Sequence, residues 1–525
     1  EEKLSPEERA RRERMRLSSR GIAGYQLSED GAKILVPLSG RLFVIDRASG
    51  SVTELSSDKG FPLDPRFSPD GKSVACVRDG NLFVIDIASG QERQLTSGAD
   101  ANISFGTAEF VAQEEMDRRE GYWWSPDSQQ ILYQRTDTTG METMHIMDAM
   151  YPERPPQTWP YPRAGQKNAD VQLGIMPATG GETTWIQWGR EKYPYVGTVR
   201  WKDGPPFLLV QNRKQTEELL YQIDPVTAAT KLLLTERDDA WVNLDDKMPR
   251  WNARGDMILW TTERDGSLQL EFVHPPSGDR ALVSDLVPGF REYLHQDTQT
   301  SAIFVQASAD PTQSHVFRCA LGLQVNRLPV EQISRVVGMH SAVFADRSGV
   351  FALSSNTLDG RRENIVFNGE GRELGKLKSV AQEPPFIPNL EIATVGELEF
   401  RAAIIRPRNF NPKLKYPVID SVYGGPHSQT VQAAARNYLL QQWIADHGFI
   451  VVSIDGRGTP SRGRNWERAI KGNLIEIPLA DQVAGLKALG EKYPEMDMSR
   501  VGIYGWSFGG YFSAMAVMRR PDVFH

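Results

Sequence analysis

The sequence predicts a β-propeller of seven or eight blades followed by an α/β domain. The propeller is predicted by a strand-and-turn unit that recurs every 40 to 50 residues or so between residues 27 and 380. The second domain is predicted by strands that alternate with helices after residue 416. With 525 residues, 40% of them hydrophobic, the chain is long enough for more than one packed core.

Residues 1–20 form the first predicted part, a single helix of about ten to twelve residues that is rich in glutamate and arginine. Ser5 is suited to the N-cap and Pro6 to the first helical position, and acidic residues occupy the first turn. The simplest interpretation of the arginines is that they lie on a solvated face.

The propeller is assigned to residues 21–385, because similar turn motifs open its repeats. The motifs at 27–31 and 67–71 lie 40 residues apart, and each leads to a Leu-Phe-Val-Ile-Asp strand. Four related openings follow, and a weaker one lies near 297–304. The four lie at 124–127, 200–204, 250–255 and 344–349. The long gap between residues 124 and 200 leaves room for one more blade, which gives the range of seven or eight.

The α/β domain is assigned to residues 386–525, after a proline-rich linker. A strand pair is expected around residues 398–405, and a parallel sheet with crossover helices is expected beyond it. The elements expected there are strands at 416–422, 449–454 and 501–504 and helices at about 430–447 and 479–492.

The clearest local motif is Gly505-Trp506-Ser507-Phe508-Gly509, which stands between a predicted strand and a predicted helix. This context is typical of a nucleophile elbow, in which a sharp turn exposes a serine hydroxyl. Ser507 is therefore the candidate nucleophile, and the amide of Phe508 is a candidate donor to an oxyanion. Tyr423, in a glycine-rich turn after an earlier strand, is either the second donor or a packing residue.

A serine hydrolase also needs a histidine base and an orienting acid, which follow the serine in α/β-hydrolases. Asp522 and His525 stand at the far end of the helix that begins at the elbow, so His525 would lie about 25 Å from Ser507. His427 and His447 precede the serine, which is the wrong order. We therefore expect the catalytic Asp and His to lie outside these 525 residues.

Composition excludes several other classes of protein. A net charge of −7 argues against nucleic acid or an anionic membrane as the partner. Two cysteines are too few for a disulfide scaffold or a cysteine-based zinc site, and no apolar run reaches the length of a membrane span. We expect no metal and no organic cofactor.

Because the chain begins at Glu1 and ends at His525 without a stop signal, a removed leader and a continuation are also expected.

Glu114 and Glu115 are the remaining unusual feature, two adjacent carboxylates just before an aromatic blade opening. By base rate such a pair is a solvated face. A pair of carboxylates also suits an ammonium group, which it would bind through charge-assisted hydrogen bonds.

These motifs resemble the dipeptidyl peptidase IV family within the prolyl oligopeptidase group of serine peptidases. The resemblance runs from the first helix to the elbow, and the double glutamate separates it from the endopeptidases of the group. The motifs that carry it are QEEMDRREGYWWSPD, YPRAGQKNADV, VYGGPHSQ, IDGRGT and GWSFGG. The resemblance implies an eight-bladed propeller joined to an α/β-hydrolase domain, and removal of Xaa-Pro or Xaa-Ala dipeptides from free peptide N-termini.

The resemblance also implies roles for individual residues. It makes Ser507 the nucleophile, Tyr423 the oxyanion phenol, and Glu114 with Glu115 the holder of the substrate's α-ammonium. QEEMDR and the arginine-rich RERMR are similar to the cytosolic eight and nine branch, in which a helix arginine contacts the carbonyl of the second substrate residue; the matching residue is Arg16. Phe508 stands where the family usually has Tyr, which removes a hydroxyl from the wall of the proline pocket.

Two alternatives stay open. One is an acylaminoacyl peptidase or oligopeptidase on the same scaffold, although a blocked N-terminus would leave Glu114 and Glu115 without a cation. The other is a catalytically inactive protein that uses the propeller for binding, although the intact Ser507 elbow argues against it. A homodimer is an expectation from the resemblance. The bacterial periplasm is the favoured location, and the cytoplasm stays open.

Overall fold

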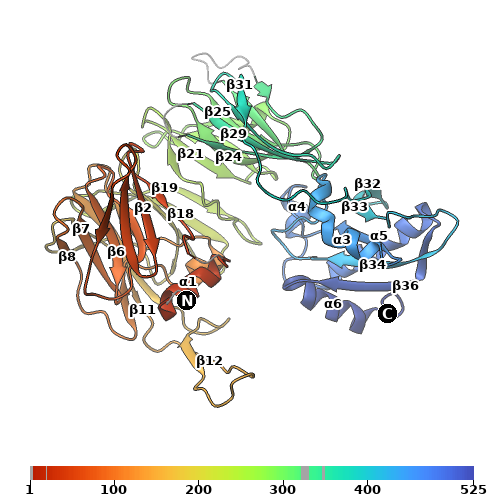
Figure 1. The fold of residues 1–525 in the computed structure, drawn as a ribbon, viewed down its shortest axis with the longest axis horizontal. Helices are drawn as coiled ribbons and strands as arrows, with labels where there is room; N and C mark the ends of the chain where they lie inside the picture. The colour runs from red at the N-terminus through yellow and green to blue at the C-terminus, as the bar shows by residue number, and fades with distance from the viewer. Residues whose placement is uncertain (1–3, 19–20, 321–329, 346–348) are drawn as a thin grey trace. The chain divides into compact units, whose positions relative to one another are not determined.

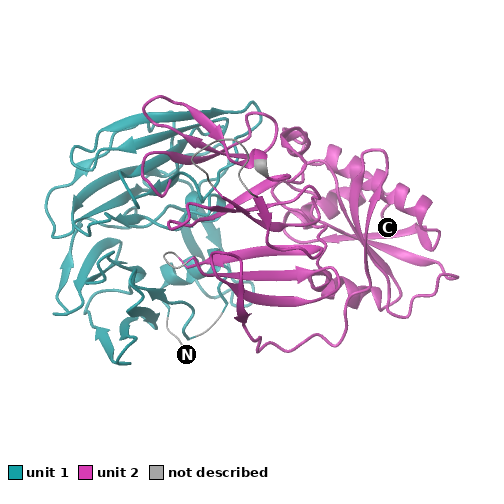
Figure 2. Cartoon of the chain, turned by 90° about the horizontal axis from the view of Figure 1, so that it is seen from above, with its two compact units in different colours: residues 1–251 teal, residues 252–525 magenta. Residues whose placement is uncertain are grey.

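The computed structural model describes residues 4–18, 21–320, 330–345 and 349–525. The chain divides into two compact units, residues 1–251 and residues 252–525 (Figure 2). This division falls inside the segment 21–385 that the sequence assigns to the propeller. Both ends of the predicted helical segment 1–20, and positions 346–348 of the predicted opening at 344–349, lie outside the described residues.

Unit 1 begins with helix α1 (Pro6–Arg14) and continues as small antiparallel sheets (Figure 1). The first sheet contains β1 (Gln26–Leu27), β2 (Lys33–Leu38), β3 (Arg41–Asp46) and β4 (Val52–Leu55). The second contains β5 (Leu63–Phe67), β6 (Ser73–Arg78), β7 (Asn81–Asp86) and β8 (Glu92–Gln94). Consecutive strands are neighbours in each of these sheets, as in a propeller blade.

The third sheet of unit 1 is larger and carries additions. It contains β9 (Ile103–Phe105), β10 (Tyr122–Trp124), β11 (Gln130–Asp137), β14 (Asp170–Pro177) and β15 (Thr184–Trp185). Helix α2 (Phe110–Glu115) lies between β9 and β10 in the chain, and the hairpin of β12 (Thr143–Ile146) and β13 (Gln157–Pro160) lies between β11 and β14. The last strands of the unit are β16 (Tyr195–Arg200), β17 (Phe207–Gln211), β18 (Glu217–Ile223), β19 (Thr230–Arg237) and β20 (Arg250–Trp251).

The repeated opening motif forms the turn between the first two strands of a sheet. In each turn a serine hydroxyl donates a hydrogen bond to the aspartate two residues later. The Oγ to Oδ1 distance is 2.6 Å both for Ser28 with Asp30 and for Ser68 with Asp70. The same bond joins Ser125 to Asp127. Such Asp and Ser turns explain why the repeat is visible in the sequence.

The cores of unit 1 lie between successive sheets. Leu35 and Leu42 of the first sheet pack with Val74 and Ile85 of the second, and all four are fully buried. Each sheet therefore covers the apolar face of its neighbour.

Unit 2 begins with three more groups of antiparallel strands. The first continues the four-stranded sheet that begins with β20 and has β21 (Ile258–Thr262), β22 (Gln269–Val273) and β23 (Arg280–Leu282), followed by the 3-10 helix η1 (Ser284–Leu286). The second has β24 (Phe290–Gln296), β25 (Ile303–Ala307), β26 (His315–Cys319) and β27 (Val330–Gln332). The third has β28 (Gly338–Phe344), β29 (Phe351–Thr357), β30 (Arg362–Phe367) and β31 (Glu373–Lys376).

The rest of unit 2 is a mixed sheet with helices. Its strand order is β32-β33-β35-β34-β36; the pairs of β34 with β35 and with β36 are parallel, and the pairs of β33 with β32 and with β35 are antiparallel. The strands are β32 (Leu390–Val395), β33 (Phe400–Ile405), β34 (Tyr416–Val422), β35 (Ile450–Asp455) and β36 (Met496–Gly505). The helices are η2 (Ala435–Tyr438), α3 (Leu439–Ala445), α4 (Arg464–Arg468), α5 (Glu476–Lys492) and α6 (Phe508–Arg519).

One predicted helix differs from the structure. The segment expected to be helical over 430–447 becomes helical only at Ala435, because the buried carboxylate of Asp455 binds the residues before it. The Thr430 N–H and the Val431 N–H donate to the two Asp455 oxygens at 3.0 and 2.9 Å. Helix α4 was not predicted.

Among the described residues, no helix has both the length and the apolar composition needed to cross a membrane.

Asp420 lies on β34, between β35 and β36 in the sheet, and its carboxyl group has no hydrogen-bond partner among the described residues. It is fully buried, and burial raises its pKa from an ordinary value of 3.8 to about 8. The folded protein therefore holds a proton here that the unfolded chain releases between these two pH values. We predict that Asp420 makes the free energy of unfolding fall as the pH rises from about 4 to 8.

The measurement is urea unfolding of the protein and of Asp420→Asn at pH 5 and pH 8. The variant should be the more stable protein at pH 8, and the difference should shrink at pH 5. Asp522→Asn is the control, because Asp522 is exposed and the Arg520 hydrogen bond lowers its pKa. An Asp420→Asn variant that loses equal stability at both pH values would contradict a proton held at Asp420.

Candidate active site

Ser507 lies at the turn between β36 and α6, as the sequence predicts for a nucleophile elbow. Its φ of 55° and ψ of −117° are strained for a residue with a side chain, and Ser507 is exposed. The turn is closed by the Gly509 N–H, which donates to the Trp506 carbonyl at 2.8 Å, and by the Tyr511 N–H, which donates to the Ser507 carbonyl at 3.2 Å. The geometry presents the Ser507 hydroxyl outside the packed core.

The elbow packs directly on the end of β34. A Cβ at Gly505 or at Gly509 would overlap with the carbonyl oxygen of Val422, the last residue of that strand. Only glycine fits at both positions, so the spacing of the motif reflects contact between two backbones. Phe508 is the first residue of α6, and its N–H has no acceptor within the helix because of helix geometry. That N–H is a donor suited to an oxyanion.

Tyr423 follows β34 and lies beside the elbow. Its ring centroid is 6.0 Å from that of Phe508, and both residues are half-buried. A Cβ at Gly425 would lie 2.8 Å from Phe508 Cδ1 and 3.0 Å from Tyr423 Cε1, so the glycine lets the two rings approach. The structure thus brings together Ser507, Phe508 and Tyr423, the three residues that the sequence proposes for catalysis.

We predict that Gly425→Ala lowers kcat about tenfold or more and changes KM little. The added methyl group displaces the Phe508 and Tyr423 rings, and donors to an oxyanion act in the transition state rather than on bound substrate. Steady-state kinetics on a chromogenic peptide would measure both constants. Gly510→Ala is the matched control, because a Cβ there makes only an ordinary contact at 3.4 Å. A raised KM with unchanged kcat would place Gly425 in substrate binding instead.

The other titratable candidates near the C-terminus have different partners. Asp522 accepts hydrogen bonds from Arg520 at 2.8 and 2.7 Å, and the His525 N–H donates to the Val501 carbonyl at 2.9 Å. His447 Nδ1 lies 2.8 Å from the Trp443 carbonyl. The side chains of Asp522 and His447 are thus engaged away from Ser507, and the identity of the base and its acid stays a prediction.

In unit 1, Glu114 and Glu115 end the short helix α2. Glu114 is half-buried and Glu115 is exposed. The Phe110 ring, at the start of α2, packs on Tyr161 with ring centroids 5.1 Å apart. Tyr161 belongs to the YPRAGQKNADV motif, so two of the motifs that carry the family resemblance meet at this helix.

Two arginines from the first helical segment contact α2. Arg14 donates to Gln113 Oε1 at 3.0 Å and stacks its guanidinium over the Phe110 ring at 5.1 Å. Arg16 forms an ion pair with Glu114, with an Nη2 to Oε1 distance of 3.0 Å. The structure therefore places Arg16 beside the acidic pair, and its proposed contact with a substrate carbonyl stays a prediction.

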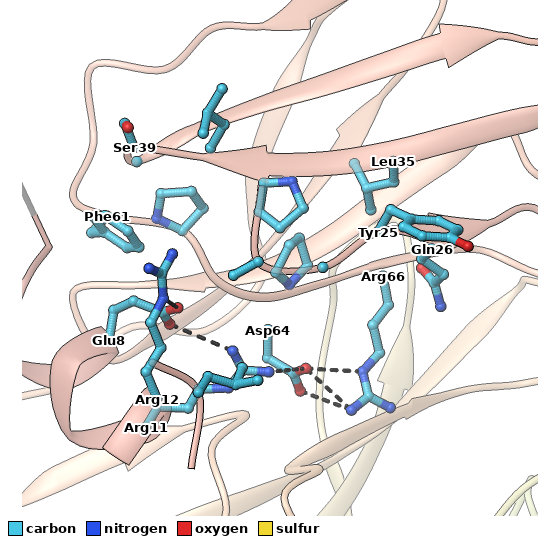
Figure 3. A pocket seen from close by; sticks show the side chains of 18 of the residues that line it. Glu8, Arg11, Arg12, Tyr25, Gln26, Leu35, Ser39, Phe61, Asp64 and Arg66 are labelled. Atoms are coloured by element: carbon cyan, nitrogen blue, oxygen red, sulfur yellow. Dashed lines mark hydrogen bonds and ion pairs between the residues drawn. The ribbon is translucent and has the colours of Figure 1, made fainter. Parts of the chain in front are cut away.

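Helix α1 is held by buried charges rather than lying free on the surface (Figure 3). Glu8 and Arg12 form an ion pair at 2.9 Å and are both buried. Arg11 reaches Asp64 at 3.3 Å, and Asp64 also pairs with Arg66 at 3.0 Å (Figure 3). The expectation of a solvated arginine face is therefore wrong for Arg12. The i,i+4 spacing to Glu8 can be seen in the sequence, but the burial of the pair cannot.

The buried residues that position α2 were also not predicted from the sequence. Arg118 is buried, donates to the Val196 carbonyl at 3.0 Å and pairs with Glu109 at 2.9 Å. Gln134 donates to the same Glu109 oxygen at 2.6 Å. Glu109 is the residue just before α2, so this network sets where the helix starts. The only sequence signal was the charge of Arg118 beside the QEEM motif.

The small antiparallel sheets and the mixed sheet with its elbow define a β-propeller joined to an α/β-hydrolase domain. Comparison with family models agrees: the N-terminal region of dipeptidyl peptidase IV matches residues 28–360, and the prolyl oligopeptidase family matches residues 437–525. The chain belongs to the dipeptidyl peptidase IV family of the prolyl oligopeptidase group.

Individual relatives are distant but match over most of the chain. Dipeptidyl peptidase 8 of Mus musculus is 24% identical over 508 residues, covering 80% of this chain and 57% of that protein. The Homo sapiens protein of the same name is 24% identical over 511 residues, with the same coverage. This chain therefore spans little more than half the length of these relatives. The crystal structure of Porphyromonas gingivalis dipeptidyl peptidase 4 has a TM-score of 0.84 at 24% identity and covers 96% of this chain and 74% of that one.

Proposed function

We propose that the protein is a serine-type dipeptidyl peptidase that releases Xaa-Pro or Xaa-Ala dipeptides from the free N-termini of peptides. The observation that carries this proposal is the occurrence in one chain of the Ser507 elbow and the acidic pair Glu114 and Glu115. Both relatives named above carry a dipeptidyl peptidase name. Membership of the family supports the same activity.

In the proposed reaction the Ser507 hydroxyl attacks the carbonyl carbon of the second substrate residue. The oxyanion that forms accepts hydrogen bonds from the Phe508 N–H and the Tyr423 hydroxyl. The Ser507 proton passes to a histidine base, which α/β-hydrolases supply later in the chain order. The histidine gives this proton to the leaving amine, whose expulsion leaves an acyl-enzyme. Water then attacks the acyl-enzyme, which releases the dipeptide and restores the Ser507 hydroxyl.

Specificity for dipeptides follows from the acidic pair. Glu114 and Glu115 hold the substrate's α-ammonium, so that the amide after the second residue is the one presented to Ser507. Arg16 is proposed to bind the carbonyl of the second residue. Phe508 keeps the aromatic contact with Tyr423, while its ring cannot donate to the proline pocket as a tyrosine hydroxyl would.

The test uses protein expressed from the uninterrupted reading frame, and compares hydrolysis of an Ala-Pro anilide with a free amine and of its N-acetylated form. We expect cleavage of the free form alone. Equal cleavage of both would assign a structural role to Glu114 and Glu115 and favour the acylaminoacyl peptidase or oligopeptidase alternative. No cleavage of either by folded protein would favour an inactive binding protein.

Four finer features belong to the same proposal. We propose eight blades, which is the number in the family, and a change from propeller to hydrolase domain near residue 385. The seven antiparallel sheets of four or five strands that can be traced among the described residues support a propeller of seven or eight blades, and the choice of eight rests on the resemblance. A homodimer is proposed from the resemblance alone. A periplasmic location is proposed from the low number of cysteines, and the cytoplasm, where the eight and nine branch of the family is found, stays open.

A further inference from the structure

Unit 2 contains a cavity of about 360 Å³ that none of the proposed active-site residues lines. Its walls come from three segments: the turn from Glu263 to Gln269, the stretch from Ser284 to Arg291, and residues 461–467 of the hydrolase domain. The volume falls within the range of about 300–1,000 Å³ found for small-molecule sites.

The walls of the cavity are fixed by hydrogen bonds between the segments. The Arg464 N–H donates to the Gly266 carbonyl at 2.8 Å, and Arg464 Nη1 donates to the Glu263 carbonyl at 3.3 Å. Arg468, which is buried, forms an ion pair with the Glu263 carboxylate. These contacts hold two of the three wall segments together without a ligand.

Two side-chain oxygens of the lining are buried without a hydrogen-bond partner among the described residues: Ser284 Oγ and Gln269 Oε1. Only 7% of the Ser284 surface is exposed. A buried polar atom without a partner costs free energy, so native proteins leave few of them unsatisfied. Both residues line the cavity, and a rotation of either side chain lets its oxygen accept a hydrogen bond from a group there.

Arg291, which also lines the cavity, is a positively charged hydrogen-bond donor. Its Nη2 donates to the Asp310 carbonyl at 2.7 Å, while its Nε is buried without a partner among the described residues. It forms no ion pair with any residue that the structure describes. Burial lowers the pKa of Arg291 to about 10, an effect that Asp310 partly offsets. A desolvated guanidinium of this kind is suited to bind a carboxylate.

We propose that this cavity binds a small zwitterion, a free amino acid or a dipeptide, whose carboxylate pairs with Arg291 and whose ammonium donates to Ser284 Oγ and Gln269 Oε1. Three carboxylates, Glu263, Asp285 and Glu467, also line the cavity and disfavour an anion without a positive group. A zwitterion satisfies both kinds of lining group.

The test is isothermal titration calorimetry with glycine and glycylglycine. We expect at least one of the two to bind, and comparison of them distinguishes an amino acid from a dipeptide as the preferred ligand. Acetylglycylglycine and glycylglycinamide, which each lack one charge, should bind at least tenfold more weakly. No heat from either zwitterion would mean that the cavity holds water only and would overturn the proposal.

Variants locate the binding. Arg291→Gln should weaken binding at least tenfold and Ser284→Ala several-fold, with folding checked by circular dichroism. Ser284→Ala, which removes one atom, serves as the locating variant if Arg291→Gln does not fold. Arg361→Gln is the matched control, because Arg361 is exposed and pairs with Asp359 outside the cavity.

A further variant separates this site from the proposed peptidase site. Glu115→Gln should leave binding of the zwitterion unchanged. Binding that is lost in Glu115→Gln and kept in Arg291→Gln and Ser284→Ala would assign the ligand to the substrate site and overturn the proposal. Failure of the peptidase assay would leave this measurement intact, because neither glycine nor glycylglycine has to be cleaved.

Discussion

Ser507→Ala is expected to lower kcat for a dipeptidyl anilide by about a million-fold, to the level of the assay background. The variant removes the hydroxyl oxygen that is proposed to form the covalent bond to substrate, while the strained turn and its glycine contacts with Val422 stay in place. Release of the chromophore, followed against uncatalysed hydrolysis, measures the loss. Thermal unfolding should show a stability close to that of the parent protein.

Ser513→Ala is the matched control for this variant. Ser513 lies one and a half turns along α6, and its hydroxyl donates to the Gly509 carbonyl at 2.7 Å. Loss of that bond costs little and should leave the rate within twofold. Comparable activity in the Ser507→Ala protein and its parent would disprove the elbow as the site of covalent chemistry.

The double variant Glu114→Gln/Glu115→Gln is expected to lower kcat/KM for the free-amine substrate about a thousandfold. Each charge-assisted hydrogen bond to the ammonium contributes about 1.5–3 kcal/mol, and both are weakened together. The single variant Glu115→Ala should already cost at least about 1–3 kcal/mol of transition-state binding. The measurement is the ratio of kcat/KM values across these proteins.

Asp117→Asn is the control for the loss of a negative charge nearby, since Asp117 is exposed and pairs only with the neighbouring Arg119 at 3.0 Å among the described contacts. Its kcat/KM should stay within about twofold of the parent value. If the double variant behaves in the same way, the acidic pair does not bind substrate.

Those parts of the fold whose cause lies within a few residues could be predicted. The Ser and Asp hydrogen bonds of the blade turns are local, so the repeat shows where the strands of each sheet begin. The elbow could be predicted for the same reason, because Ser507 and the glycines around it stand side by side in the sequence.

Features that depend on residues far apart in the chain could not be predicted. The helix expected over 430–447 starts late because Asp455, some 25 positions away, binds Thr430 and Val431. Arg118 and Glu109 meet Val196 and Gln134 only in the folded sheet. The pattern of charge and hydropathy along the chain does not indicate such long-range partners. The hydrogen bonds that position α2 could therefore be identified only in the structure.

The contact of Gly505 and Gly509 with the Val422 carbonyl has a consequence for the timing of entropy loss. Because the two backbones are in contact, the turn can adopt only one conformation, so Ser507 and the Phe508 amide are ordered when the domain folds. The conformational entropy of that turn is lost once, during folding, and no part of it has to be lost again in each catalytic cycle. The strained conformation of Ser507 is therefore offset by the stability of the folded sheet and does not have to be produced by substrate binding.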